Sequence, residues 1–204
     1  MIKLENIEVF GWEAAIRGAR NPMNSWHRID SDFKMLKLGS NDYKLMKQLC
    51  IAGKDHRKYM RMINIYIDIT APLYWWKEFD TYKVGTVANS CSTMHKIHAK
   101  GFTLEDFSHE HLLPFAEQDL KIIINSLNKY RDKYLETKDK QYWWQMIQLL
   151  PSSYNQKRTV QLNYEVLNHM YHSRKHHKLD EWKNFCKILK NMPYSEFITG
   201  EFDE

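Results

Sequence analysis

The chain has 204 residues, a formal net charge of +5, 43% hydrophobic residues and 14% aromatic residues. This length and apolar content suffice for one sizeable core, so we predict a single domain over residues 1–204. The mild charge fits a small anionic ligand or a weak nucleic-acid surface and requires neither. No apolar run approaches the roughly 20 residues of a membrane helix, and the N-terminus lacks the apolar core of a signal peptide. The three cysteines are odd in number and far apart, which favours reduced thiols in a cytoplasmic protein without a membrane partner.

The N-terminal quarter of the sequence predicts one strand and two helices. Residues 2–10 carry apolar side chains that are interrupted only by Glu5 and Asn6, a pattern typical of a strand. Residues 12–20 have a helical composition, and the proline after Asn21 ends that helix. A second helix is predicted over residues 43–52, because polar capping residues precede it and a glycine follows it.

The clearest strand lies in the middle of the chain. Four isoleucines between Ile63 and Ile69 alternate with other residues, and a period of two is typical of a strand with one buried face. Thr70 can cap a helix and Pro72 is tolerated in a first helical turn, so we predict a helix immediately after the strand. A strand, a short helix and a polar loop can hold donors beside a phosphate or a base. A core strand followed by a packing helix is the simpler interpretation.

The second half of the sequence is mainly helical. Apolar residues spaced three and four apart predict helices over residues 115–135 and 139–150, and a final helix starts near Leu179 and ends before Pro193. The residues from Thr103 to Asp106 form a pattern typical of the start of a helix. We also predict a helix from about Arg158, which would place Asn163, Val166, Met170 and Arg174 along one side.

Two groups of histidines raise the question of a metal site. His95 and His98 are three residues apart, and His169, His172 and His176 follow one stripe of the helix predicted from Arg158. A helix spreads its side chains apart, so three imidazoles on one face seldom converge on one ion. The first pair has no obvious further ligands nearby. We therefore predict no metal site.

The order of these motifs resembles that of the flavin-dependent thymidylate synthases over most of the chain. That family has a strand, an Ala-Pro helix and then the signature R-H-R-x-x-S-x-N-E-x-S-x-R-Y, and here the isoleucine strand leads into Ala71-Pro72 at the matching place. Further along, the family has Leu-Pro, a spacer, Asn-x-Arg-Ser-Leu and an arginine on the same helix. The matching residues here, with the same spacing, are Leu150-Pro151, Asn163, Leu167 and Arg174.

Several signature positions differ from the family pattern. Without a gap, the alignment places Thr81-Tyr82-Lys83 at Arg-His-Arg, Cys91 at the serine and Thr93-Met94 at Arg-Tyr. A shift of one residue recovers Asn89 and Ser92 but no arginine, and the arginine of Asn-x-Arg-Ser becomes Glu165. Lysine offers a phosphate a point charge in place of a bidentate guanidinium, so phosphate binding at Lys83 would be weaker.

The resemblance implies an α+β fold like that of the thymidylate-synthase-complementing proteins, with helices packed around a small mixed or antiparallel sheet. It implies the reductive methylation of dUMP to dTMP, with FAD as cofactor and with NADPH and methylenetetrahydrofolate as co-substrates. In that family the flavin performs the redox step and no protein nucleophile attacks the uracil ring, so we assign no catalytic residue. The resemblance also implies a homotetramer whose sites lie between subunits.

The same resemblance assigns binding roles. The substrate-binding residues would be Arg174 with Ser92 or Cys91, and the cofactor-binding residues would be Tyr82, Lys83, Asn163 and His169. An alternative function is a catalytically inactive nucleotide-binding homologue that senses or sequesters a nucleotide, because two signature arginines are replaced and Glu165 reverses a charge. A third is a nucleic-acid-binding helical module that uses Trp75, Trp76, Trp143 and Trp144. Paired tryptophans at helical spacing are more often core residues.

Overall fold

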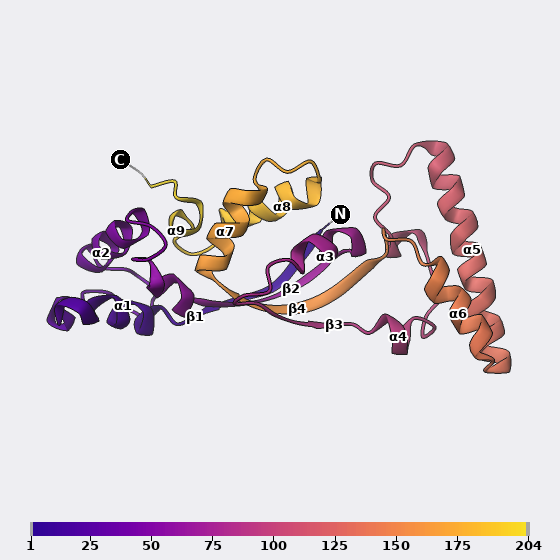
Figure 1. Ribbon diagram of the computed structural model, residues 1–204, viewed down its shortest axis with the longest axis horizontal. Helices are drawn as coiled ribbons and strands as arrows, with labels where there is room; N and C mark the ends of the chain where they lie inside the picture. The colour runs from indigo at the N-terminus through magenta and orange to yellow at the C-terminus, as the bar shows by residue number, and fades with distance from the viewer. Residues whose placement is uncertain (1, 203–204) are drawn as a thin grey trace. The chain divides into compact units, whose positions relative to one another are not determined.

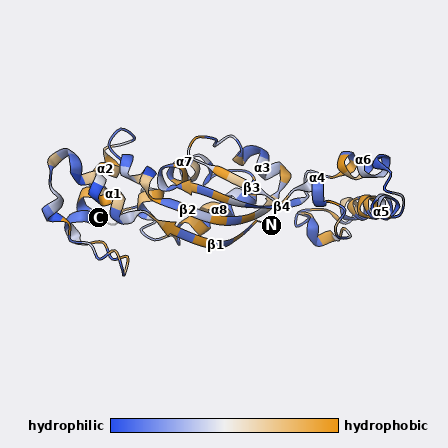
Figure 2. Cartoon of the chain, turned by 90° about the horizontal axis from the view of Figure 1, so that it is seen from below, coloured by the Kyte–Doolittle hydropathy of each residue, from blue (hydrophilic) through white to orange (hydrophobic). Residues whose placement is uncertain are grey.

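The computed structural model describes residues 2–202. Its fold is α+β, as predicted, with helices around a four-stranded antiparallel sheet in the order β1-β2-β4-β3 (Figure 1). The strands are β1 (Lys3–Phe10), β2 (Asn64–Pro72), β3 (Val87–Ser90) and β4 (Asn155–Asn163). Apolar and polar residues interleave along these strands (Figure 2). This alternation follows from the period of two that gives a strand one buried face.

The helices confirm most of the sequence predictions. They are α1 (Trp12–Arg20), α2 (Ser40–Ile51), α3 (Leu73–Phe79), α4 (Thr93–Lys96), α5 (Pro114–Thr137), α6 (Lys140–Leu149), α7 (Tyr164–Arg174), α8 (Asp180–Leu189) and α9 (Glu196–Thr199). Short 3-10 helices lie at η1 (Asn21–Met23), η2 (Trp26–Arg28), η3 (Lys58–Met62) and η4 (Leu104–Asp106). Within residues 2–202, no helix is both long and apolar enough to cross a membrane.

The prediction of a helix from Arg158 was wrong, because residues 155–163 form β4 and α7 begins only at Tyr164. Val160 and Leu162 are fully buried while their neighbours are more exposed, so the strand period of two holds here. Asn163 then caps α7, and its side-chain oxygen accepts the Val166 N–H at 3.0 Å. A strand and a helix therefore meet at Asn163.

The expected helix start at Thr70 was also wrong. β2 continues through Pro72, and α3 begins at Leu73. The backbone N–H of Leu73 donates to the Tyr154 carbonyl at 3.0 Å, and that of Tyr74 donates to the Ser152 carbonyl at 3.0 Å. These pairings hold the chain extended, and Pro72 is tolerated at the end of the strand because its missing N–H breaks no central ladder bond. The strand β3 and the helices α4 and α9 had no sequence prediction.

The chain forms two compact units, and each strand contributes residues to both. The first unit comprises residues 1–4, 69–81 and 89–159, and the second comprises residues 5–68, 82–88 and 160–204. The single domain predicted over residues 1–204 stays a prediction.

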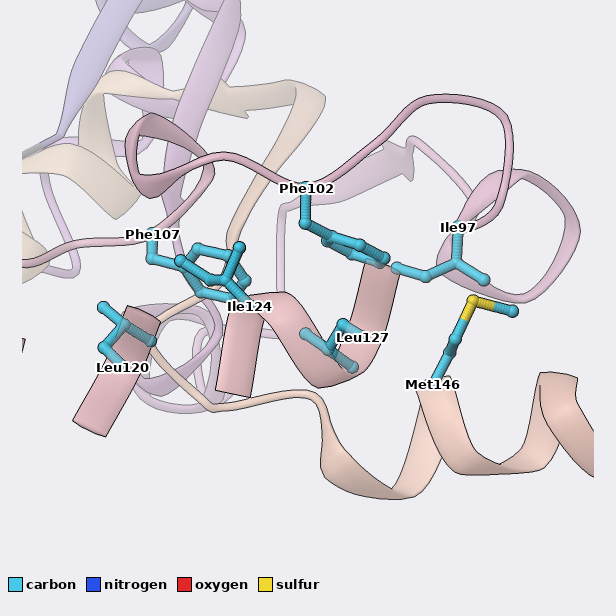
Figure 3. Close-up of a cluster of buried hydrophobic side chains, with 7 residues drawn as sticks. All are labelled: Ile97, Phe102, Phe107, Leu120, Ile124, Leu127 and Met146. Carbon is cyan, nitrogen blue, oxygen red and sulfur yellow. The ribbon is translucent and has the colours of Figure 1, made fainter. Parts of the chain in front are cut away.

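The core of the first unit lies between α5, α6 and the segment that precedes them (Figure 3). Its buried members are Ile97, Phe102, Phe107, Leu120, Ile124, Leu127 and Met146. Asn128 ties α5 to this segment, because its side chain accepts the Phe102 N–H at 2.8 Å and donates to the Phe102 carbonyl at 2.9 Å. Each fully buried Leu or Phe side chain contributes roughly 1.5–3 kcal/mol to such a core.

The core of the second unit is rich in aromatic rings. Trp12 packs edge to face against Tyr164 at 5.2 Å and against Tyr194 at 5.3 Å, and Phe197 lies in the same cluster. Such pairs add about 0.5–1.5 kcal/mol beyond the burial of their area. This packing fixes the start of α7, where the strand ends.

Candidate functional site

A cavity of about 500 Å³ opens in the second unit, within the range of roughly 300–1,000 Å³ usual for small-molecule sites. We call it the cationic cavity. Its walls are Lys54, Arg57, Arg61, Val84, Gly85, Asn163, Glu165, Val166, Asn168, His169 and His172. Three permanent cations face one carboxylate, so the cavity suits an anionic ligand.

Two adjacent segments form one wall of the cationic cavity. Gly85 has a φ of +79°, a left-handed conformation that glycine adopts without a steric cost. A Cβ at this position would also lie 3.1 Å from the Asn163 amide nitrogen and 3.1 Å from a Val166 methyl group. The loop before β3 therefore lies directly against the start of α7, and a side chain at residue 85 would displace the side chains of Asn163 and Val166.

Glu165, at the position of the family's second arginine, forms an ion pair with Arg57. Arg57 Nε lies 2.8 Å from one carboxylate oxygen, and Nη2 donates to the other at 3.2 Å. The side chains are only 20% and 11% exposed, so each charge needs its partner. An arginine from the segment before β2 thus lies beside the position where α7 lacks one. Within residues 2–202 no hydrogen bond to Nη1 of Arg57 is formed, so this group can bind a ligand.

The cations of this wall also affect His172. The pKa of His172 is lowered, first because burial disfavours the charged ring and then because Lys175 and Arg57 repel it. A neutral His172 offers one donor and one acceptor to a ligand in the cationic cavity.

The structure brings Arg174, Tyr82 and His169 together at the edge of this site. Arg174 Nε donates to the Tyr82 hydroxyl at 2.8 Å, and the guanidinium lies over the Tyr82 ring at 5.5 Å and the Trp182 ring at 4.9 Å. The Tyr82 ring meets the His169 ring edge to face at 5.5 Å. His169 and Asn163 line the cavity, whereas Arg174 contacts Tyr82 and is not one of the lining residues. Lys83 is exposed next to Val84.

Cys91 and Ser92 lie in the first unit, in a separate cavity of about 220 Å³. Ser92 caps α4 and accepts the His95 N–H at 3.1 Å, while Cys91 is an exposed free thiol. Lys96, Lys100 and Lys157 line the same cavity, so we call it the lysine pocket. The substrate role of Cys91 and Ser92 stays a prediction, as do the roles assigned to Arg174, Tyr82, Lys83, Asn163 and His169.

Sequence reasoning missed Lys54, Arg57 and Arg61 as site residues. They are three and four residues apart before the isoleucine strand, a signal that indicates one basic face but names no ligand. The histidines do not form a metal cluster: among residues 2–202, no three His, Cys, Asp or Glu side chains are grouped as metal ligands. Trp75 and Trp76 are fully buried, so they cannot stack on bases.

The whole chain has the fold of the flavin-dependent thymidylate synthases and of a related nucleotide methylase. Thymidylate synthase X from Helicobacter pylori, solved with FAD and dUMP, superposes with a TM-score of 0.69 at 14% identity, over 97% of this chain and 96% of that one. The UMP/dUMP methylase PolB from Streptomyces cacaoi, bound with 5-Br dUMP, superposes with a TM-score of 0.70 at 12% identity, over 99% and 95% of the chains. No protein-family model and no curated protein matches the sequence.

Proposed function

We propose that the protein binds a pyrimidine nucleotide beside a flavin and catalyses the reductive methylation of dUMP to dTMP. Two observations support this proposal. The fold is shared with proteins that were solved with FAD and dUMP or with a brominated dUMP. The cationic cavity, which carries the proposal, sets three cations and two imidazoles beside the amide of Asn163.

The donor set of the cationic cavity fits the phosphate-bearing part of a flavin or a nucleotide. Lys54 and Arg61 are exposed at its edge, and Arg57 keeps donors beyond those that Glu165 occupies. Val84 and Val166 give an apolar wall on which a ring can pack. We therefore assign phosphate binding to Lys54, Arg57 and Arg61.

FAD, when bound, would supply the hydride, while methylenetetrahydrofolate gives the carbon and NADPH gives the reducing equivalents. The protein's own contribution is to position the ligands. Asn163 is fixed by its cap bond to α7, so its amide nitrogen can donate to a ring carbonyl without further ordering. His169 is fixed by Tyr82 and can orient the same ring.

The proposal includes a homotetramer in the cytoplasm. Large apolar side chains are exposed on α5, α6 and the residues just before α5, and Leu113, Phe115, Ile122 and Trp144 are 74%, 86%, 63% and 44% exposed. Copies of the chain that pack on this face would bury these side chains. Light scattering on the purified protein tests the assembly, and a monomer at micromolar concentration would contradict it.

The central experiment is the visible absorbance spectrum of the purified protein before and after incubation with FAD and dUMP and desalting. Retained flavin bands, followed by dTMP formation with NADPH and methylenetetrahydrofolate, are the expected result. Absence of both flavin retention and dUMP binding would overturn the proposal.

A second candidate is a nucleotide-binding protein without redox chemistry. The observation that favours it is the packing of Arg174 against Tyr82 and Trp182, together with the loss of both arginines of the Arg-His-Arg triplet. A colourless protein that still binds dUMP in calorimetry would select this function over the first.

A further inference from the structure

The positive charge of this chain is concentrated near its C-terminal end. The segment from His172 to Lys190 holds six Lys or Arg residues against two acids, a net +4 compared with +5 for the whole chain. One of these acids, Glu181, is buried. The exposed surface of the segment is therefore strongly basic, and none of its lysines is among the residues assigned above to phosphate binding.

Part of this charge surrounds a groove of about 440 Å³ in the second unit, which we call the basic groove. Lys183, Lys187 and Lys190 follow one face of α8 and its end, because they are four and three residues apart. Lys175 and His176 approach from the end of α7. Four lysines thus converge on one concave surface.

Two of these lysines already have carboxylate partners, but the pairs are exposed. Lys183 lies 2.8 Å from Asp180, and Lys190 lies 2.9 Å from Glu201. All four side chains are about half exposed, so water screens both pairs and an anion can replace the carboxylates at little cost. Among residues 2–202, neither Lys175 nor Lys187 has an ion pair.

We propose that the basic groove is a second ligand site, which binds the polyphosphate of a nucleoside triphosphate. Adjacent phosphate groups present several negative charges over a short distance, which matches four lysines around one groove. The Glu201 carboxylate and the Tyr171 hydroxyl, which are hydrogen bonded at 2.8 Å in the wall, offer acceptors for ribose hydroxyl groups. Bound nucleotide would bridge α7 and α8, and α7 also carries Asn163 and Glu165 at its start.

A small ligand fits this surface better than a nucleic acid does. The groove volume is in the small-molecule range of about 300–1,000 Å³. The ten residues of α8 span only about 15 Å, whereas a specific nucleic-acid interface buries on the order of 1,000 Å² or more. The lysines also gather around a hollow and do not form a long stripe.

The test is calorimetry of ATP, inorganic tripolyphosphate and a single-stranded DNA 20-mer with the full chain. The variant Lys183→Gln/Lys187→Gln should weaken ATP and tripolyphosphate binding at least about tenfold, the effect of losing one charge-assisted contact or more. The matched control is Lys129→Gln/Lys133→Gln, two exposed lysines with the same spacing on α5, which should leave ATP affinity unchanged.

Three results would overturn the proposal. ATP affinity could be equal in the wild type and Lys183→Gln/Lys187→Gln. Tripolyphosphate could bind where ATP does not, which would remove the nucleoside. The DNA could bind more tightly than ATP with an affinity that grows with strand length, which would assign the surface to nucleic acid.

Discussion

Two arginine–carboxylate pairs in the second unit differ in how fully their hydrogen-bonding groups are used. Asp42 is fully buried and binds Arg20 at 2.7 Å, and it also accepts bonds from the backbone of Asp30 and Ser31 and from the Ser31 hydroxyl. Glu165 and Arg57 form a similar pair at 2.8 Å in the wall of a cavity.

The difference between the pairs lies in their surroundings. The carboxylate of Asp42 is saturated by protein donors, so this pair joins α1, α2 and the loop between them and has little left for a ligand. Arg57 keeps free donors that a cavity can present to an anion. The same two functional groups thus serve the fold in one place and, in our proposal, ligand binding in the other.

The largest expected effect is on the buried pair. Asp42→Ala leaves the Arg20 charge buried without a partner, so it should lower the free energy of unfolding by roughly 3–5 kcal/mol in urea denaturation. Glu136→Gln, which breaks an exposed pair with Lys133, is the control and should leave the free energy of unfolding close to that of the wild type, because water screens the pair. Equal losses in the two variants would contradict the structural role of Asp42.

Substitutions in the Arg57–Glu165 pair should change ligand affinity more than they change the free energy of unfolding. Arg57→Ala should weaken dUMP or FAD binding by roughly 1.5–3 kcal/mol, the scale of a hydrogen bond to a charged group, as measured by calorimetry. Glu165→Gln keeps the shape and removes the negative charge, so it should not weaken the binding of an anion. An unchanged affinity in Arg57→Ala, with the wild type binding normally, would remove Arg57 from the site.

Substitution of Arg174 tests whether the nucleotide-binding site extends from the cationic cavity to this residue. If Arg174 holds the nucleotide phosphate, Arg174→Ala should weaken dUMP binding by roughly 1.5–3 kcal/mol. Tyr82→Phe removes only the acceptor of the Arg174 Nε–H and should cost about 0.5–1.5 kcal/mol of unfolding free energy. A stability loss in Arg174→Ala with unchanged dUMP affinity would show that Arg174 only packs on Tyr82 and Trp182.

The smallest effect is a pH dependence from His172. Its pKa is lowered from 6.5 in the folded chain, mainly by burial, so the folded state binds fewer protons than the unfolded state. The stability contribution is complete above about pH 6.5 and is lost as the pH falls through the lowered pKa. His172→Gln should reduce the difference in thermal midpoint between about pH 5.5 and pH 7.5.

The local elements of this fold could be predicted because their signals are local. The isoleucine alternation predicts β2, and apolar residues spaced three and four apart predict α5 and α6. β4 could not be predicted so easily, because its alternation is short and runs directly into the helical pattern of α7. Residues 155–163 form a strand because they pair with other strands, and those strands are distant in the sequence.

The candidate site was harder to predict, because its residues are still farther apart in the sequence. Arg57 and Glu165 are 108 positions apart, so no spacing rule joins them, and Glu165 by itself indicated only a lost cation. The resemblance to a known family pointed to Asn163 and His169, which line the cavity. It did not point to Lys54, Arg57 or Arg61, because these residues occupy a segment outside the family's signature.

Gly85 has a consequence for any survey of sequence tolerance in this protein. Its positive φ strains any other residue there, and a Cβ would lie 3.1 Å from the side chains of both Asn163 and Val166. In a saturation-mutagenesis screen selected for ligand binding, position 85 should therefore favour glycine and rank among the sensitive positions. A reader of such a map would take it for a residue that touches the reacting atoms. Its intolerance instead would record how closely the backbone at residue 85 approaches the side chains of Asn163 and Val166 in the cavity wall.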